Sequence, residues 1–196
     1  PAVAMSRRNM ILVGVAGVVI VVGAWAVGHM SGSSIPGISG TPSASATPSA
    51  SGGVDQAQVA ALMQKISENP NDADSLWNLG NIYFQVQDYK SAQSFYRMLV
   101  KVAPKDANAW IALGATAFNQ QDQRLSFSAW SKAVRVDSKN VEAHYDLGFW
   151  YFSQQPSQTA KGEAEWNLVV KLAPDSDFAS TVKQHLSNLA SPSATP

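Results

Sequence analysis

Residues 73–106 read ADSLWNLGNIYFQVQDYKSAQSFYRMLVKVAPKD, and residues 107–140 read ANAWIALGATAFNQQDQRLSFSAWSKAVRVDSKN. A Leu-Gly dipeptide stands at the same place in both stretches and once more in the segment that follows. The three glycines, Gly80, Gly114 and Gly148, recur at a fixed period of 34 residues. Such a period is typical of stacked helix–turn–helix units. The sequence therefore predicts an all-α repeat architecture.

Each unit contains two apolar stripes with helical spacing, which a single amphipathic helix could not bury. Asp72 and Asp88 precede the stripes of the first unit, where N-cap residues are expected. Pro104 follows the second stripe and disfavours helical geometry at the residue before it. Small residues, Gly80 and Ala92, stand where the two helices must come close. The stripes are Leu76, Leu79, Gly80 and Tyr83 on the first helix, and Ala92, Phe95, Tyr96, Leu99 and Val102 on the second.

This pattern resembles the tetratricopeptide repeat (TPR) over about residues 70–176. Six residues stand at signature positions of that family: Leu79, Gly80, Tyr83, Ala92, Tyr96 and Pro104. The resemblance implies a solenoid of three helix–turn–helix repeats over 73–106, 107–140 and 141–176. We expect helices near 73–86, 89–102, 107–119 and 124–136.

The second and third repeats depart from the pattern without losing its frame. Ala117, Ser126 and Ser138 replace signature residues in the second repeat. The third repeat is two residues longer, and the extra residues are expected within 154–161. Trp166 then aligns with Tyr96 and Trp130, so each repeat keeps an aromatic residue at this place.

One helix is expected on each side of the repeats. Residues 54–69 carry an apolar stripe after a candidate N-cap, Asp55, and fill the second-helix slot of a missing repeat. Residues 176–190 combine an apolar stripe with a polar face, as expected for a capping helix at the end of a solenoid. The repeats and these two helices together make a TPR domain over residues 54–190.

Residues 1–30 are predicted to anchor the chain in a membrane. The run from Met10 to Val27 carries no charge, and as a helix it would reach roughly 27 Å, just enough to cross the bilayer core. Arg7 and Arg8 precede it, which places the N-terminus in the cytoplasm and the rest of the chain on the extracytoplasmic side. A cleaved signal peptide is the alternative, because Ala24-Trp25-Ala26 fits a signal-peptidase site.

Residues 31–53 are almost entirely Ser, Gly, Pro, Ala and Thr, and residues 191–196 have a similar composition. Such segments have too few apolar side chains to offset the entropy of ordering. We interpret the first as a linker, which would span about 25 Å as a random coil, and the second as a disordered tail.

Composition and motifs exclude several classes of function. The formal net charge is zero, which argues against nucleic-acid binding. The chain has no cysteine, so thiol catalysis and cysteine-ligated metal are excluded. No paired carboxylates, catalytic constellation or phosphate-binding loop stand out, and His144 is expected in the core. We therefore predict a protein that is not an enzyme and that has no cofactor or metal.

The TPR resemblance implies that the first helices line a concave groove. Its expected binding residues are mostly aromatic or amide side chains, and lysine and arginine are missing from them. They are Asp74, Trp77, Asn81, Phe84, Gln85, Ile111, Phe118, Asn119, Tyr145, Phe149 and Phe152. The corresponding positions also include Asn108, Ala115, Glu142 and Ser153.

An exposed row of aromatic rings would form an apolar patch of a kind that monomers rarely leave bare. One explanation is self-filling, in which the rings pack against one another or under the capping helix. The other is a partner, either an apolar helix or an extended peptide, anchored on the rings; a small apolar ligand is a third reading.

The sequence thus predicts a membrane-anchored, extracytoplasmic TPR scaffold of a bacterium that binds a protein partner in its groove. It would serve as an accessory subunit of a membrane complex. The alternatives are an assembly factor resembling the TPR proteins of c-type cytochrome biogenesis, and a binding protein secreted after signal cleavage.

Overall fold

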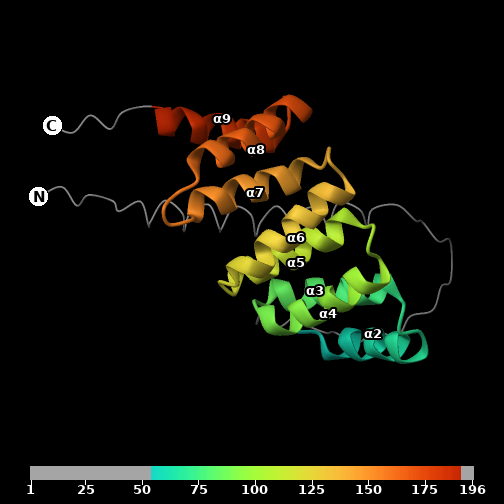
Figure 1. Cartoon of the computed structure of the whole chain (residues 1–196). Helices are drawn as coiled ribbons and strands as arrows, with labels where there is room; N and C mark the ends of the chain where they lie inside the picture. The colour runs from blue at the N-terminus through green and yellow to red at the C-terminus, as the bar shows by residue number, and fades with distance from the viewer. Residues whose placement is uncertain (1–53, 191–196) are drawn as a thin grey trace, which may run out of the picture.

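The computed structural model describes residues 54–190, and every regular element among them is an α-helix. The helices stack from α2 at one end to α9 at the other (Figure 1). Their bounds are α2 Gln56–Glu68, α3 Ala73–Gln85, α4 Tyr89–Val102, α5 Ala107–Asn119, α6 Gln123–Val136, α7 Val141–Ser153, α8 Thr159–Leu172 and α9 Asp177–Ala190. The bounds expected from the sequence agree with these to within two residues.

The helix starts follow from short polar side chains that accept hydrogen bonds from otherwise unpaired backbone N–H groups. Asp72 accepts from the Ser75 N–H at 3.2 Å, and Asp88 accepts from the Ser91 N–H at 3.1 Å. Asp or Asn side chains likewise cap α2, α5, α6 and α7. The exception is α8, whose N-cap Gln158 makes no side-chain cap bond. This helix follows the loop 154–158, which lies inside the predicted insertion site.

The two helices of each repeat are held together by an aromatic ring that lies across a glycine. Tyr96 of α4 lies over Gly80 of α3, Trp130 of α6 over Gly114 of α5, and Trp166 of α8 over Gly148 of α7. A Cβ atom built on Gly114 would lie only 2.5 Å from Nε1 of Trp130, and the other two glycines leave even less room. These rings are almost completely buried. The close approach of the two helices that was expected from the sequence is confirmed, and the aromatic ring fills the space left by the missing glycine side chain.

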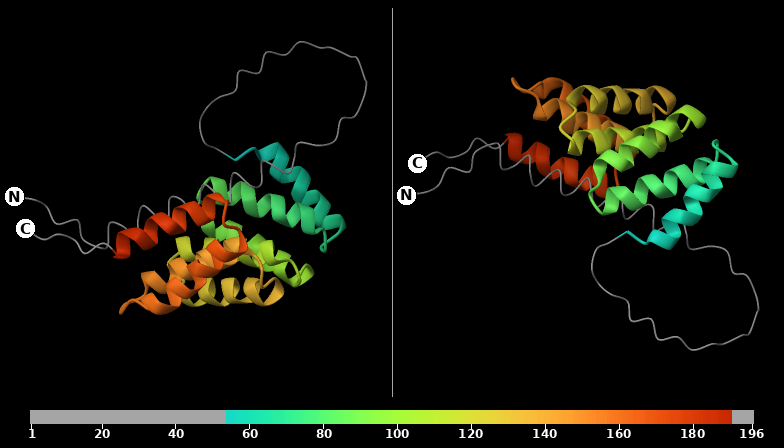
Figure 2. Two further views of the ribbon diagram at one scale, coloured as in Figure 1. Left: turned by 90° about the horizontal axis from the view of Figure 1, so that it is seen from above. Right: turned by 90° about the horizontal axis from the view of Figure 1, so that it is seen from below.

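The repeats stack by packing each first helix, α3, α5 or α7, against the second helix of the preceding repeat. Successive pairs turn relative to one another along the stack (Figure 2). At one end α2 packs on α3, as expected for the second-helix slot of a missing repeat. At the other end α9 packs on α8 and also touches α7, in the way that α7 packs on α6 and touches α5. The capping helix therefore occupies the first-helix slot of a fourth repeat.

The apolar core divides into two clusters. The larger one runs through the first two repeats and reaches Leu147 of the third. The smaller one joins α7, α8 and α9 through Tyr145, Phe149, Trp166 and Val182. The third repeat and the capping helix thus share a mostly aromatic core of their own.

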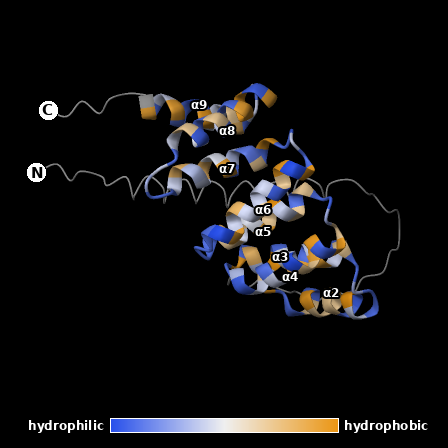
Figure 3. Ribbon diagram, viewed as in Figure 1, coloured by the Kyte–Doolittle hydropathy of each residue, from blue (hydrophilic) through white to orange (hydrophobic). Residues whose placement is uncertain are grey.

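Among residues 54–190, no helix is both long enough and apolar enough to span a membrane. Polar and apolar residues are mixed along each of the drawn helices (Figure 3). The predicted membrane segment Met10–Val27, the linker 31–53 and the tail 191–196 lie outside the described residues.

Replacing Gly114 with alanine should destabilise the protein by about 1–3 kcal/mol, because the new methyl group would overlap the Trp130 indole. The sign is informative, since alanine in place of glycine inside a helix otherwise stabilises by roughly 0.8–1.0 kcal/mol. Urea denaturation followed by circular dichroism measures the difference.

The matched control is a double-mutant cycle with Trp130→Leu. Once the indole is absent, Gly114→Ala should cost much less or even stabilise. Additive effects of the two substitutions would contradict the proposed contact.

Candidate functional site

The predicted groove residues all lie on the first helices α3, α5 and α7, but the structure exposes only some of them. Asp74 and Gln85 are exposed, whereas Trp77, Asn81, Phe118, Asn119 and Phe152 are partly exposed. Four others are buried: Phe84, Ile111, Tyr145 and Phe149. The expectation of a continuous exposed aromatic row is therefore wrong for Phe84, Tyr145 and Phe149.

Even the partly exposed aromatics of the groove pack against the rings that lie over the glycines. Trp77 meets Tyr96 edge-on at a centroid distance of 5.9 Å, and Phe118 meets Trp130 at 5.5 Å. In the third repeat Phe152 lies 4.5 Å from Trp166. Aromatic pairs at these centroid distances are favourable, so each ring that lies over a glycine is stabilised by an aromatic side chain of the first helix. Much of the predicted binding wall thus belongs to the core of each repeat.

In the third repeat, the capping helix covers the rest of the wall. Phe178 of α9 lies 5.0 Å from Tyr145, and His185 of α9 lies 5.7 Å from Phe149. The rings of Tyr145 and Phe149 also contact Trp166. The self-filling explanation therefore accounts for Tyr145 and Phe149, and the surface still open to a partner is concentrated on α3 and α5.

The amide side chains of this surface are partly engaged within the chain. The Tyr96 hydroxyl donates to Oδ1 of Asn81 at 2.7 Å. Asn119 donates through Nδ2 to the Ala115 carbonyl at 2.9 Å. Among residues 54–190, the NH₂ group of Asn81 and the carbonyl oxygen of Asn119 have no such partner, so both can form hydrogen bonds with the main chain of a bound peptide.

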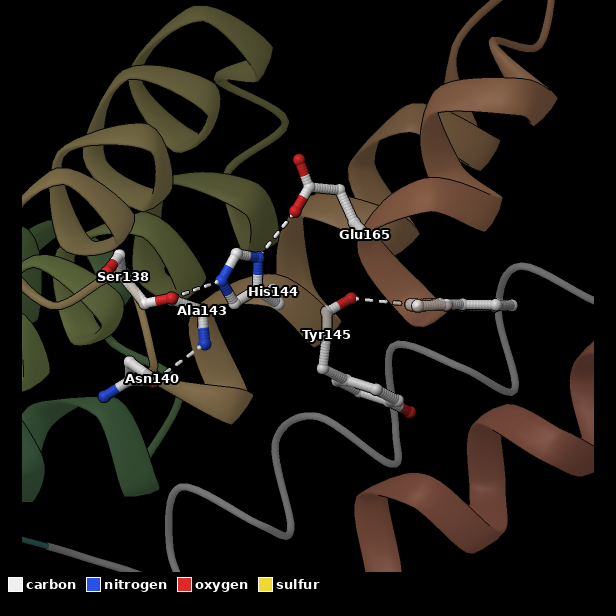
Figure 4. A network of polar contacts seen from close by, with 7 residues as sticks. Ser138, Asn140, Ala143, His144, Tyr145 and Glu165 are labelled. Atoms are coloured by element: carbon white, nitrogen blue, oxygen red, sulfur yellow. Dashed lines mark hydrogen bonds and ion pairs between the residues drawn. The ribbon is translucent and has the colours of Figure 1, made fainter. Parts of the chain in front are cut away.

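His144 lies in the core of the third repeat, as predicted, and joins its two helices. Its Nδ1 lies 2.6 Å from a carboxylate oxygen of Glu165, and its Nε2 lies 3.1 Å from the Ser138 carbonyl (Figure 4). The hydrogen bond with Glu165 is the main cause that raises the pKa of the His144 imidazole, and burial opposes it. The first helix of this repeat is thus tied to the second by an ion pair as well as by Trp166.

A pair of carboxylates on α7 contradicts the expectation that no paired carboxylates stand out. Glu142 and Asp146 lie one turn apart on the same face of the helix. Asp146 is only 1% exposed, and its Oδ2 atom has no hydrogen-bond partner. Burial raises the pKa of Glu142 to about 7, and it raises the pKa of Asp146, on which the charge of Glu142 also acts. The only sequence signal was the i, i+4 spacing of two acids on a helix that is otherwise largely apolar.

Beside Glu142 lies a cavity of about 520 Å³ where the N-terminal ends of α5, α7 and α9 meet. Its polar wall comes from Lys105, Asp106, Asn108 and Asp137, together with Glu142. The Phe178 side chain supplies an aromatic wall. The first helices therefore offer two features: a partly open strip on α3 and α5, and an acidic cavity beside α7.

No family model matches the sequence, and no curated protein does. Solved structures do match it. A crystal structure of MamA aligns with a TM-score of 0.55 at 20% identity, covering 59% of this chain and 67% of that one. MamA from Desulfovibrio magneticus RS-1 aligns with a TM-score of 0.54 at 23% identity, covering 61% and 66%. The Arabidopsis OM64 TPR domain aligns with a TM-score of 0.54 at 18% identity, covering 59% and 94%. This chain has the tetratricopeptide repeat fold.

The likeness concerns the TPR fold alone, because sites are grafted onto folds independently of their architecture. The chain spans about two thirds of the length of these MamA structures. Within residues 54–190, no group of three or more His, Asp or Glu side chains is arranged to hold a metal ion. The absence of enzymatic activity and of a cofactor remains a prediction from the sequence.

Glu165→Gln should lower the free energy of unfolding of this TPR domain by about 1.5–3 kcal/mol at acidic pH, the range for a hydrogen bond to a charged group. Because the folded state raises the pKa of His144, the contribution is complete below the ordinary value of 6.5. It fades as the pH rises through the raised pKa. Chemical denaturation across this range measures it, and an effect independent of pH would contradict the charged pair.

Asp146→Asn should stabilise the domain by about 1–3 kcal/mol near pH 7.5, because it replaces a carboxyl group whose ionisation is opposed by burial with an amide that carries no charge. The folded state retains protons on Asp146 and Glu142 that the unfolded state releases. Wild-type stability should therefore fall as the pH rises from about 4 towards 7.

Chemical denaturation of the wild type and of Asp146→Asn at different pH values tests whether the substitution stabilises the domain. Below about pH 3 the substitution should have little effect, because the carboxyl groups are then largely protonated in both the folded and the unfolded state. Destabilisation at both pH values would contradict the burial of an unpaired acid.

Proposed function

We propose that this chain is a scaffold that binds a segment of a partner protein along the first helices of its TPR domain. The observation that carries the proposal is the strip on α3 and α5, where Trp77 and Phe118 are partly exposed beside the exposed residues Asp74 and Gln85. Binding interfaces commonly combine aromatic anchors with polar neighbours of this kind.

The polar groups on the strip favour an extended segment over an amphipathic helix. The unused NH₂ of Asn81 and carbonyl oxygen of Asn119 can pair with a peptide main chain, as can the exposed amide of Gln85. A helix satisfies its own main-chain groups and would need a broad apolar surface. The burial of Phe84, Tyr145 and Phe149 leaves too little of that surface.

We further propose that the domain acts on the extracytoplasmic side of a membrane as an accessory subunit of a membrane complex. The support is the uncharged run Met10–Val27, preceded by Arg7 and Arg8 and followed by the Ser- and Pro-rich linker 31–53. Such a tether would keep the domain close to the membrane surface while leaving the first helices accessible.

Capture with the full chain tests this function. The protein, with residues 10–27 intact, is purified in mild detergent from its native membrane and its co-purifying proteins are quantified. A subunit should retain one partner at stoichiometric amounts. An assembly factor would retain only newly made protein, and a mature N-terminus near residue 27 would indicate a secreted protein.

Replacing Trp77 or Phe118 with alanine should weaken binding of that partner by more than about 2 kcal/mol, or roughly 30-fold, if the rings are anchors. The matched control is Trp110→Ala. Trp110 is also a partly exposed tryptophan on a first helix, but its indole donates to the Pro104 carbonyl and lies outside the predicted groove set. Circular dichroism checks that all three variants remain folded. Equal affinities of Trp77→Ala and Trp110→Ala for the partner would contradict the proposal that the groove binds it.

A further inference from the structure

The second helices α4 and α6 carry basic side chains and no acidic ones. Each has three basic residues; five of the six are exposed, and Lys132 is partly exposed. Within residues 54–190 none of them takes part in an ion pair. The first helices α3, α5 and α7 show the opposite pattern, with three acidic residues and no basic one. The six basic residues, which form the basic face, are Lys90, Arg97, Lys101, Arg124, Lys132 and Arg135.

The acids closest in sequence do not cancel this charge. Asp88 and Asp122 cap α4 and α6, and each already accepts a hydrogen bond from a backbone N–H group of its own helix. Three basic residues against one capping acid leave each helix with two positive charges in excess. The loops that follow, 103–106 and 137–140, each contain one lysine and one aspartate and so add no net charge.

The basic face lies on the outer side of the stack. Lys90, Arg97 and Lys101 stand at i, i+7 and i+11 on α4, which is one face of a helix. Arg124 and Arg135 occupy two of the equivalent positions on α6, 34 residues later. The opposite faces of both helices are buried against their first helices. The first helices also touch one another, α5 with α7 and α7 with α9, as expected on the inner side of a curved stack.

Two large apolar side chains are exposed on the second helices as well. Met98 of α4 and Leu168 of α8 are each 37% exposed. They hold equivalent positions, two residues after the ring that lies over a glycine, and each is followed three residues later by an exposed lysine, Lys101 or Lys171. Apolar side chains beside cations are suited to the boundary of a bilayer, where headgroups meet acyl chains.

We propose that the basic face binds the surface of a bilayer that contains anionic phospholipids, with the second helices turned towards the membrane. The proposal rests on the membrane location proposed above. Cations attract an anionic bilayer surface, and the contributions of several side chains add. The linker 31–53, which would span about 25 Å as a random coil, keeps the domain close enough for weak contacts to be effective.

The composition of this face favours lipid over a folded acidic partner. Serine side chains separate the basic residues at Ser94, Ser128 and Ser131, so few other groups are available for specific recognition. Headgroups of a fluid bilayer can move to match charges spaced along two helices, whereas a protein surface must present fixed complementary groups. Binding in this orientation would direct the strip on α3 and α5 away from the membrane, where a partner segment can reach it.

Fluorescence quenching on the full-length chain tests the proposal. The chain has no cysteine, so Ser128→Cys provides a single labelling site on the basic face. The labelled protein, with residues 10–27 intact, is placed in nanodiscs of phosphatidylcholine, with or without phosphatidylglycerol, that contain a lipid with a nitroxide quencher on its headgroup. Quenching should be at least about twofold greater in the anionic discs and should fall to the neutral level at high salt, because salt screens charges.

Variants identify the charges responsible. Lys101→Gln combined with Arg135→Gln should remove at least about half of the additional quenching, since binding depends on the number of cations. The matched control combines Lys65→Gln with Lys183→Gln, which removes two exposed charges from the end helices α2 and α9, and it should have no effect. A label at Gln85→Cys, on the strip of α3, should be quenched less than the label at position 128. Circular dichroism confirms that all variants are folded.

The outcomes separate the basic face from the membrane anchor. Equal quenching in neutral and anionic discs, or quenching that survives Lys101→Gln with Arg135→Gln, overturns the basic face. If that variant instead loses the partner captured from native membranes, the face binds an acidic protein and the lipid proposal is wrong. A chain that does not enter neutral discs contradicts the anchor. Anionic discs at low salt should then still retain it, and failure to do so overturns the basic face as well.

Discussion

The contact between a glycine on one helix and an aromatic ring on the next is the constraint from which the rest of this structure follows. Tyr96, Trp130 and Trp166 each occupy the space that a Cβ atom would need at Gly80, Gly114 or Gly148. The ring fixes the separation and angle of the two helices in a repeat, because interiors are close-packed and adjust little to changes in volume. Repeating this contact every 34 residues, with a two-residue insertion absorbed by the loop 154–158, builds the stack.

The same contact determines what the first helices can offer a partner. In the third repeat, Trp166 extends beyond Gly148 and packs against Tyr145 and Phe149, so both become core residues. In the first repeat, Phe84 is covered by Tyr89 of the second helix. The remaining strip carries ring edges and amides instead of a broad apolar trough. In the scaffold function proposed here, such a strip would discriminate partners through main-chain hydrogen bonds and a few anchors.

The third repeat differs from the other two in burying a histidine and an aspartate. Its first helix carries His144, paired with Glu165, and the Glu142–Asp146 pair, while its aromatic core is shared with α9. Buried ionisable groups cost free energy unless they are paired. This repeat therefore combines one satisfied polar contact, His144–Glu165, with one unsatisfied buried oxygen, Oδ2 of Asp146.

The sequence alone determined the repeat period, the helix bounds, most N-caps and the close approach of two helices at each glycine, because these depend on local spacing and on residue size. That an aromatic ring fills this approach was decided by the tertiary structure. The resemblance to the TPR family also implied that Phe84, Tyr145 and Phe149 lie on the groove-facing side of their helices. Only the tertiary structure decided that this side is covered, since the covering rings come from the second helix of the repeat and, in the third repeat, also from α9. The isolation of Asp146 was equally invisible in the sequence, because an acid at i+4 on a helix is exposed or buried according to which helices pack against that face.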